Sequence, residues 1–445
     1  MGGLAVRSER VVLPDGVRPA TVRIEDGRIV EIAPHGARPT GVPEFAVGQL
    51  VVLPGIVDSH VHINDPGRAH WEGFETATRA AAAGGVTTVV DMPLNSIPPT
   101  TTVEGLEAKR AAAAGRCFVD VAFWGGVVPG NTGELEPLAH AGVRGFKCFM
   151  APSGVEEFPH VTEADLREAM PALHHLDLPL LAHAESPEHL LVPEGNPVQH
   201  ETWRRSRPPE AEQTAIELLV RLSREYGTRV HVVHLASAEA VAVVRQARAE
   251  GVRITGETCP HYLTFAAEDI PDRATVFKCA PPIRERSQRE MLWEALGAGD
   301  IDLVATDHSP APPSTKCVET GDFIRAWGGI ASLQIGLLAT MTGAAMRGIG
   351  IDAVTRWMSS APARLAGLAA IKGGIVPGAD ADLVIFDPDA TTIVDPQRLH
   401  HRHPLTPYAG RQLRGAVRTT FLRGEVVFEG AVMPLPRGKM IGSGR

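Results

Sequence analysis

The sequence predicts an α/β protein: a (β/α)₈ TIM-type barrel with a small β-sandwich formed from both ends of the chain. Two observations predict this fold. Short β-rich segments alternate with helical stretches through the middle of the chain, and turn-rich segments of alternating hydrophobicity flank them on both sides. The chain has 445 residues, 44% of them hydrophobic, which is ample for a core of this size. We expect residues 1–54 and 371–445 to form the sandwich and residues 55–370 to form the barrel.

The two ends of the chain share one sequence pattern. The segments RVVLPD and ATVRIEDGRIVEIAP contain PDG and EDG turns, and this pattern predicts antiparallel strands. The segments DADLVIFD and RGAVRTTFLRGEVVFEGAV repeat it between residues 372 and 430. Two β-rich ends that flank a barrel favour a single sandwich built from both, and two unrelated extensions are the alternative.

Eight β-rich segments lie between Gly55 and about residue 310. They span residues 56–63, 87–93, 119–126, 143–149, 178–185, 229–236, 252–258 and 301–307. The sequence between them is rich in Ala, Leu and Glu, and several of these stretches end in glycine, as helices often do. Strands that alternate with helices predict a parallel sheet, and eight units over roughly 250 residues match a closed barrel. An open doubly wound sheet is the alternative, but no GxGxxG follows the first segment.

Composition excludes several classes of partner. Acidic residues outnumber basic ones by 52 to 43, for a formal net charge of −9, so nucleic acid is not expected. The N-terminal sequence lacks the apolar core of a signal peptide, and no window approaches the roughly 18 apolar residues of a membrane span. The five cysteines form no CxxC pair, which is typical of a reduced cytoplasmic protein. We expect a cytoplasmic protein with a small-molecule substrate.

The C-terminal ends of the expected barrel strands carry candidate metal ligands, which is where such barrels place catalytic side chains. The first strand ends in His60 and His62, and their i, i+2 spacing directs both side chains to one side. Later strands add Lys147, His183, His234 and Asp307. Imidazoles with a carboxylate suit zinc and similar divalent ions. Each of these residues alone is more simply interpreted as a core or loop residue. Candidate ligands at five of the eight strand ends together indicate a metal site.

Lys147 requires a physical explanation of its own, because its neighbours Phe146 and Phe149 are apolar. Burial and nearby positive charge lower the pKa of a lysine and leave a neutral amine that can react with CO₂. The resulting carbamate is an anionic ligand with two oxygen atoms, able to bridge two metal ions. Two ions about 3.5–4 Å apart would also hold a bridging hydroxide.

The HVH run, Lys147, His183, His234 and ATDHSP together resemble the cyclic amidohydrolases of the amidohydrolase superfamily, which include dihydroorotases, dihydropyrimidinases or hydantoinases, and allantoinases. The resemblance covers nearly the whole chain, since KGGIVPGADADLVIFD is similar to the family's returning β-sandwich segment. It implies that one metal is bound by His60 and His62 with Asp307 and the other by His183 and His234, and that N6-carboxylated Lys147 bridges them. It also implies a homotetramer. We expect two zinc ions, although Mn²⁺, Co²⁺ or Ni²⁺ suit the same ligands.

Two positions distinguish branches within this family. Asn64 stands where dihydroorotases carry arginine and hydantoinases carry aspartate, so a fixed guanidinium for a substrate carboxylate is missing there. Leu94 precedes Asn95, whereas dihydroorotases read Met-Pro-Asn. The runs DMPLNSIPPTT, GFKCF, FPHVTEADL and KCAPPIR resemble the allantoinase branch most closely, which implies hydrolysis of (S)-allantoin to allantoate. The same resemblance implies that the substrate contacts Asn64, Asn95, Ala280 and Gly328.

For this activity we expect a hydroxide held between the metals to attack the ring carbonyl, with Asp307 as general base and then general acid. A hydantoinase is the first alternative and a dihydroorotase the second. A catalytically inactive scaffold is the non-enzymatic alternative. The presence of all six ligand residues argues against it. Segment 151–162 is either a lid or an ordinary surface loop. We expect His261 to be structural and the HHRH run (400–403) to be solvated.

Overall fold

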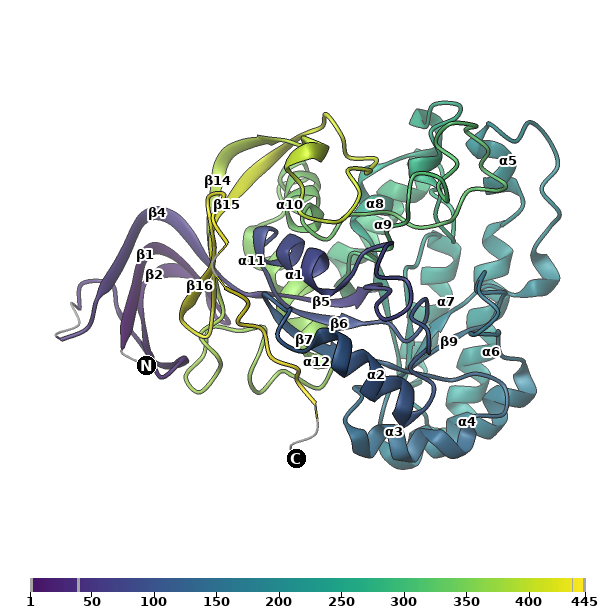
Figure 1. Cartoon of the computed structure of the whole chain (residues 1–445), viewed down its shortest axis with the longest axis horizontal. Helices are drawn as coiled ribbons and strands as arrows, with labels where there is room; N and C mark the ends of the chain where they lie inside the picture. Colours follow the sequence, from purple (N-terminus) through teal and green to yellow (C-terminus); the bar gives the residue numbers. More distant parts are fainter. Residues whose placement is uncertain (1–2, 38–40, 434, 443–445) are drawn as a thin grey trace.

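The computed structural model describes residues 3–37, 41–433 and 435–442, and it has the predicted architecture of a parallel barrel beside a small β domain. The N-terminal strands lie next to the C-terminal strands, and together they form the β domain at one end of the molecule (Figure 1). The barrel and its helices make up the rest. The prediction that both ends of the chain build one β domain is therefore confirmed.

Each of the eight predicted segments contributes one parallel strand to the barrel. The strands are β5 (Ile56–Val61), β6 (Val86–Asp91), β7 (Asp120–Phe123) continued by β8 (Gly125–Gly126), β9 (Phe146–Phe149), β10 (Leu180–His183), β11 (Val230–Val232), β12 (Ile254–Thr258) and β13 (Leu303–Val304). They are almost entirely buried, which explains why they read as apolar runs rather than as alternating ones. The ring closes where the His62 N–H donates to the His308 carbonyl at 2.8 Å.

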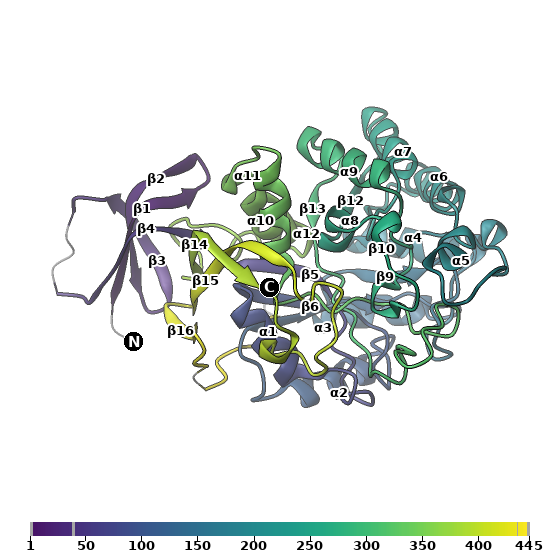
Figure 2. The same cartoon turned by 90° about the horizontal axis from the view of Figure 1, so that it is seen from above.

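Helices surround the outside of the barrel (Figure 2). They are α1 (Phe74–Ala83), α2 (Val103–Ala113), α3 (Leu135–Ala141), α4 (Glu163–Leu176), α5 (His200–Arg205), α6 (Pro209–Tyr226), α7 (Ala238–Ala249), α8 (Pro260–Thr264), α9 (Arg286–Ala298), α10 (Gly336–Met346), α11 (Ile351–Thr355) and α12 (Ala361–Leu365). Helix α4 shows how the sequence sets their bounds. Thr162 and Asp165 form a capping box at its start, and Asp177 ends it in a left-handed conformation. In the described part of the chain, no helix combines the length and apolar character needed to span a membrane.

The β domain is a single seven-stranded sheet. Its strands are β1 (Leu4–Leu13), β2 (Gly16–Glu25), β3 (Arg28–Pro34), β4 (Glu44–Pro54), β14 (Leu383–Ile393), β15 (Gln412–Leu422) and β16 (Glu425–Glu429), in the spatial order β16-β15-β14-β4-β1-β2-β3. The expectation of antiparallel strands is wrong for one pair, because β1 and β4 run parallel. Strand β4 leads directly into the first barrel strand, and this continuation fixes its direction.

A buried ionic cluster joins the β domain to the barrel. The Nζ atom of Lys372 lies 2.7 Å from carboxylate oxygens of both Asp120 and Asp382 and 3.0 Å from Asp380. Arg423 also donates to Asp120, which belongs to barrel strand β7. The surrounding carboxylates raise the pKa of Lys372 against the opposing effect of burial, so the ammonium stays charged. The segment after β16 adds a further contact to β7, since the Ile441 N–H donates to the Val121 carbonyl.

Substituting Lys372 by methionine would leave three neighbouring carboxylates without their shared cation. We expect Lys372→Met to lower the free energy of unfolding by about 3–5 kcal/mol, measured by urea denaturation. The matched control is Arg28→Ala, because Arg28 approaches Asp380 at 3.7 Å but is 55% exposed, and we expect little change. Equal effects of the two substitutions would contradict the assigned role of the cluster.

Candidate metal centre

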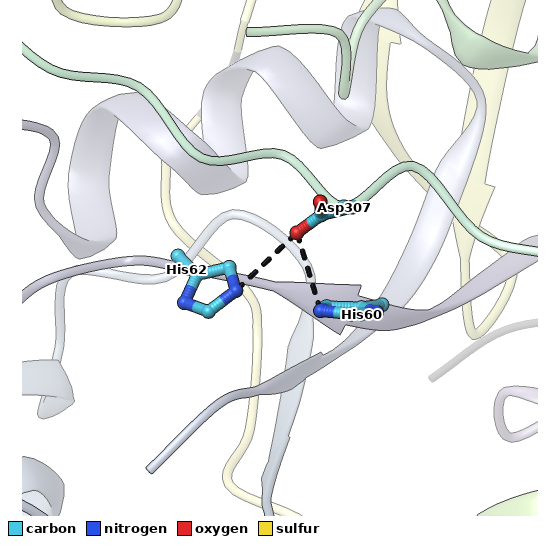
Figure 3. A group of neighbouring side chains, drawn as sticks. All are labelled: His60, His62 and Asp307. Atoms are coloured by element: carbon cyan, nitrogen blue, oxygen red, sulfur yellow. Dashed lines mark ion pairs between the residues drawn. The ribbon is translucent and has the colours of Figure 1, made fainter. Parts of the chain in front are cut away.

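Three of the predicted ligands converge at the end of the barrel where the first and eighth strands meet. The Nε2 atoms of His60 and His62 lie 3.2 and 3.3 Å from the same Oδ1 atom of Asp307, and Figure 3 shows both rings directed at that oxygen. Ligand atoms of all three residues lie within 4.8 Å of one another, and the three side chains are buried. This group could hold a metal ion.

The second predicted group lies on the neighbouring strands. The Nδ1 atom of His183, at the end of β10, is 3.0 Å from the Nε2 atom of His234, which follows β11. Lys147 on β9 is fully buried, and its Nζ donates to the Cys148 carbonyl at 2.9 Å and lies 3.8 Å from the centre of the Phe149 ring. The rings of His60 and His234 are 5.6 Å apart, so the two groups adjoin.

Two buried glutamates that the sequence interpretation missed contact these histidines from outside. Glu257 Oε1 lies 2.5 Å from His60 Nδ1, and Glu185 Oε2 lies 2.6 Å from His183 Nε2. Each glutamate lies within or just after an apolar strand segment, and that position is the only signal the sequence offers.

The geometry around Asp307 fits a cation. When His60 donates its Nδ1–H to Glu257, its Nε2 carries a lone pair, and this lone pair faces the carboxylate oxygen of Asp307. Two acceptors at 3.2 Å repel one another unless a positive charge lies between or beside them. Imidazole nitrogen and carboxylate oxygen together suit zinc and related divalent ions. The residues present therefore match the chemistry of a divalent metal site.

Burial sets the ionisation of the groups at this rim. It lowers the pKa of the Lys147 amine to about 7, so that near neutral pH a large fraction of the amine is uncharged. Burial raises the pKa of Asp307, but the surrounding imidazoles of His60, His62 and His234 together outweigh that effect, and the pKa lies well below its usual range. Asp307 is thus a carboxylate next to nitrogen ligands.

A buried carboxylate, Asp58, holds the two strands that carry the first group. Its Oδ1 accepts the backbone N–H groups of His60 at 3.1 Å and Thr306 at 3.2 Å, and its Oδ2 accepts the Thr306 hydroxyl at 2.6 Å. Both His234 and Asp307 adopt left-handed backbone conformations, with φ of 43° and 46°. Such conformations are costly for residues other than glycine and are typical of functional sites.

A cavity of about 250 Å³ opens onto these groups and holds most of the predicted substrate contacts. Asn95, Ala280 and Gly328 line it together with the four histidines and Asp307. Asn64 is absent from its described lining, because its amide nitrogen is directed at the Pro310 carbonyl at 3.4 Å. The predicted contact between Asn64 and a substrate therefore stays a prediction.

The loop after β9 forms one side of the cavity. Its residues 152–154 line the cavity, and the buried ring of Phe158 and an ion pair between Arg68 and Glu157 hold it in place. Other cavity residues were missed by the sequence interpretation: Trp203, Arg207, Lys278, Ser309 and Trp327. They lie in segments between strands, where no periodicity marks them.

His261 and His401, two histidines outside the predicted ligand set, are both buried. His261 is fully buried and does not line the cavity, although one of its ring nitrogens lies within 4.8 Å of ligand atoms of Cys259 and Asp307. The expectation that the HHRH run is solvated is wrong for His401, which is buried beside the ring of His308. This run folds back onto the barrel, where the Arg402 N–H donates to the carboxylate of Glu72.

Comparison with known proteins adds an independent line of evidence. Residues 51–427 match the Amidohydrolase family. The chain is 50% identical over 440 residues to an allantoinase of Streptomyces avermitilis and 43% identical over 455 residues to an allantoinase of Saccharomyces cerevisiae, with 98% of both chains covered in each case. Among solved structures, an L-hydantoinase (dihydropyrimidinase) from Arthrobacter aurescens has a TM-score of 0.95 at 31% identity and covers 99% of this chain and 100% of that one.

Buried neutral histidines predict a loss of stability in mild acid. Burial lowers the pKa of His200 to about 4, whereas an unfolded histidine titrates near its ordinary value, so between these values the unfolded state binds more protons. The free energy of unfolding should therefore fall as the pH falls from about 6.5 to about 4. His200→Leu should reduce this fall by on the order of 2 kcal/mol, measured by urea denaturation of metal-stripped protein at about pH 7 and about pH 4.5. An unchanged pH dependence in the variant would contradict the assignment.

Proposed function

Because this chain belongs to the amidohydrolase family, we propose that it hydrolyses the ring amide of allantoin to give allantoate. The observation that carries the proposal is a buried group of histidines and one aspartate at the end of a barrel that is similar to allantoinases over nearly its whole length. An inactive scaffold would not need to keep this costly arrangement of buried polar groups.

The predicted ligands divide between two cations in the proposed site. His60, His62 and Asp307 would hold one, His183 and His234 would hold the other, and Lys147 as a carbamate would lie between them. The neutral amine that burial favours is the form that reacts with CO₂, which supports this modification. Two such ions would supply a water of lowered pKa and would polarise the carbonyl of the substrate. We propose zinc for both, on the basis of ligand chemistry.

The proposed reaction forms one bond and breaks another. The oxygen of water bonds to the ring carbonyl carbon, and the ring C–N bond breaks. Asp307 accepts a proton from the attacking water at its carboxylate and returns it to the departing ring nitrogen. Its position on the cavity wall, within reach of His60 and His62, suits both steps.

Among the described residues, two of the three cationic side chains of lysine and arginine that line the cavity are already engaged, which supports a neutral substrate. Arg207, Lys278 and the exposed Arg325 line the cavity, but the first two are already engaged. Arg207 forms a bidentate pair with Glu185, and Lys278 Nζ donates to the carbonyls of Ile324 and Ala326. The amide of Asn95 and the backbone groups of Ala280 and Gly328 then supply neutral contacts for a hydantoin ring, whose N–H and C=O groups complement those of a peptide.

Two wider properties follow from the family resemblance and complete the proposal. We propose that the chain acts in the cytoplasm as a homotetramer. The scattered, unpaired cysteines support a reducing environment such as the cytoplasm. The chain's similarity to a hydantoinase structure makes a hydantoinase the second candidate function.

A comparison of four substrates tests the proposed activity. We expect metal-loaded protein to open allantoin with a higher kcat/KM than hydantoin, dihydrouracil or dihydroorotate, because Asn95 and the backbone of Ala280 and Gly328 offer neutral contacts while Arg207 and Lys278 are already engaged. Ring opening can be followed by loss of ultraviolet absorbance or by chromatography. Faster turnover of hydantoin or dihydrouracil would favour the second candidate function, and faster turnover of dihydroorotate would contradict the neutral-substrate argument.

Substituting Asp307 by asparagine removes the proposed proton carrier while keeping the side-chain shape. We expect Asp307→Asn to lower kcat by about 100-fold or more, measured with allantoin under steady-state conditions. The control is Asp165→Asn, which alters a carboxylate at the start of helix α4, away from the cavity, and should leave kcat unchanged. Near-normal rates in Asp307→Asn would end the assignment of Asp307 as base.

A further inference from the structure

The buried glutamates Glu257, Glu185 and Glu212 can be compared, because the first two contact predicted ligands of the candidate metal centre and the third does not. Glu257 and Glu185 each accept a hydrogen bond from the imidazole of one predicted ligand, whereas Glu212 pairs with Arg284 at 2.6 Å and touches no predicted ligand. A buried carboxylate is costly unless its partners compensate for lost hydration. The partners of these three therefore reveal what each carboxylate does.

Glu257 links the first group of ligands to the interior of the barrel. Its Oε1 is 2.5 Å from His60 Nδ1, and its Oε2 is 3.1 Å from His231 Nε2. A carboxylate accepts hydrogen bonds and does not donate them, so the proton of the His60 ring resides on Nδ1. The Nε2 atom of His60 then keeps its lone pair free to bind a metal ion, and this is the atom that faces Asp307.

Glu185 performs the corresponding task for the second group with the opposite ring nitrogen. Its Oε2 is 2.6 Å from His183 Nε2, which places the ring proton there and leaves Nδ1 free toward His234. Arg207 holds Glu185 from the other side through hydrogen bonds to both oxygens, of 2.9 Å to Oε1 and of 2.6 and 3.2 Å to Oε2. The carboxylate is therefore fixed in direction as well as neutralised.

The other histidine of each predicted pair has no such support. Among the described residues, the Nδ1 atom of His62 meets only the Asn95 amide at 3.5 Å, and the Nδ1 atom of His234 has no hydrogen-bond partner. Each group thus contains one imidazole locked by a carboxylate and one that is not. Carboxylates in this position fix the tautomer and orientation of a ligating histidine and strengthen it as a ligand.

We propose that Glu257 and Glu185 are positioning residues that act on different metal ions: Glu257 presents His60 Nε2 to the first, and Glu185 presents His183 Nδ1 to the second. This inference rests on the two-metal site of the proposed function but not on the identity of the substrate. Arg207 belongs to the same unit as Glu185, and because it also lines the cavity it connects the substrate side of the site to the second ion.

The test measures zinc binding without any substrate. Metal-stripped wild-type protein, Glu257→Gln, Glu185→Gln and the double variant are equilibrated with a series of buffered Zn²⁺ concentrations, and zinc per chain is determined by elemental analysis. We expect two ions in the wild type and a loss of affinity of about 10- to 100-fold for one ion in each single variant. The double variant should lose affinity for both ions. Glu212→Gln is the matched control, and it should bind zinc as the wild type does.

Several outcomes would overturn the proposal. Unchanged zinc binding in either single variant would remove the role of that glutamate, and a double variant that still binds one ion normally would show that both act on the same ion. A similar loss in Glu212→Gln would assign the effect to general destabilisation. If the glutamine variants do not fold, Glu257→Asp and Glu185→Asp keep the charge but withdraw it from the ring, and the same selective losses are expected.

The assigned ring nitrogens provide a second readout that general destabilisation would not produce. A glutamine amide reaches the position of Nε2 and an asparagine amide that of Nδ1, so His60→Gln should retain more zinc than His60→Asn. The order should reverse at position 183, where His183→Asn should retain more than His183→Gln. The opposite order at either position would overturn the assignment there. If the wild type binds two ions but does not hydrolyse allantoin, the proposed function fails while this inference stands.

Discussion

The closure of the barrel between its first and eighth strands is the constraint on which the site depends, and the carboxylate of Asp58 reinforces it. Asp58 binds the backbone of both strands within two residues of His60 and Asp307. The contacts that close the ring therefore also set the separation of two predicted ligands. Burial raises the pKa of Asp58 to about 6, so the enclosed carboxylate depends on its three hydrogen bonds for compensation. The hydrogen bonds of Asp58 therefore stabilise the barrel and position two predicted metal ligands at the same time.

The parts of the structure that follow local rules were predictable from sequence. Alternation along a strand places His60 and His62 on one side, and the strand–helix rhythm locates all eight barrel strands. What the sequence could not reveal depends on partners far apart in the chain. Glu257 contacts His60 across 197 positions, and the local sequence around each residue does not indicate the contact with the other. The parallel pairing of β1 with β4 escaped for the same reason, because strand direction follows from where the chain continues and not from its periodicity.

The wall of the cavity is shaped by amines bound to backbone carbonyls. Lys278 donates to two carbonyls of segment 324–326, and Lys316 donates to the carbonyls of Lys278, Trp327 and Gly329. Because the partners of these amines are carbonyl dipoles and not carboxylates, burial lowers their pKa values to about 8 and about 7. The segment that carries Gly328 is thus fixed by hydrogen bonds at its main chain.

The position of β4 in the small sheet has a consequence for biosynthesis. Strand β4 lies between β1 and β14, and Pro54 pairs with Leu383. A ribosome therefore releases the first four strands long before the partner that covers the open edge of β4 exists. For that period a row of unpaired backbone groups is accessible to other nascent chains. The whole barrel segment must be synthesised before β14 can reach this edge, so the strands translated last complete the sheet that the strands translated first begin.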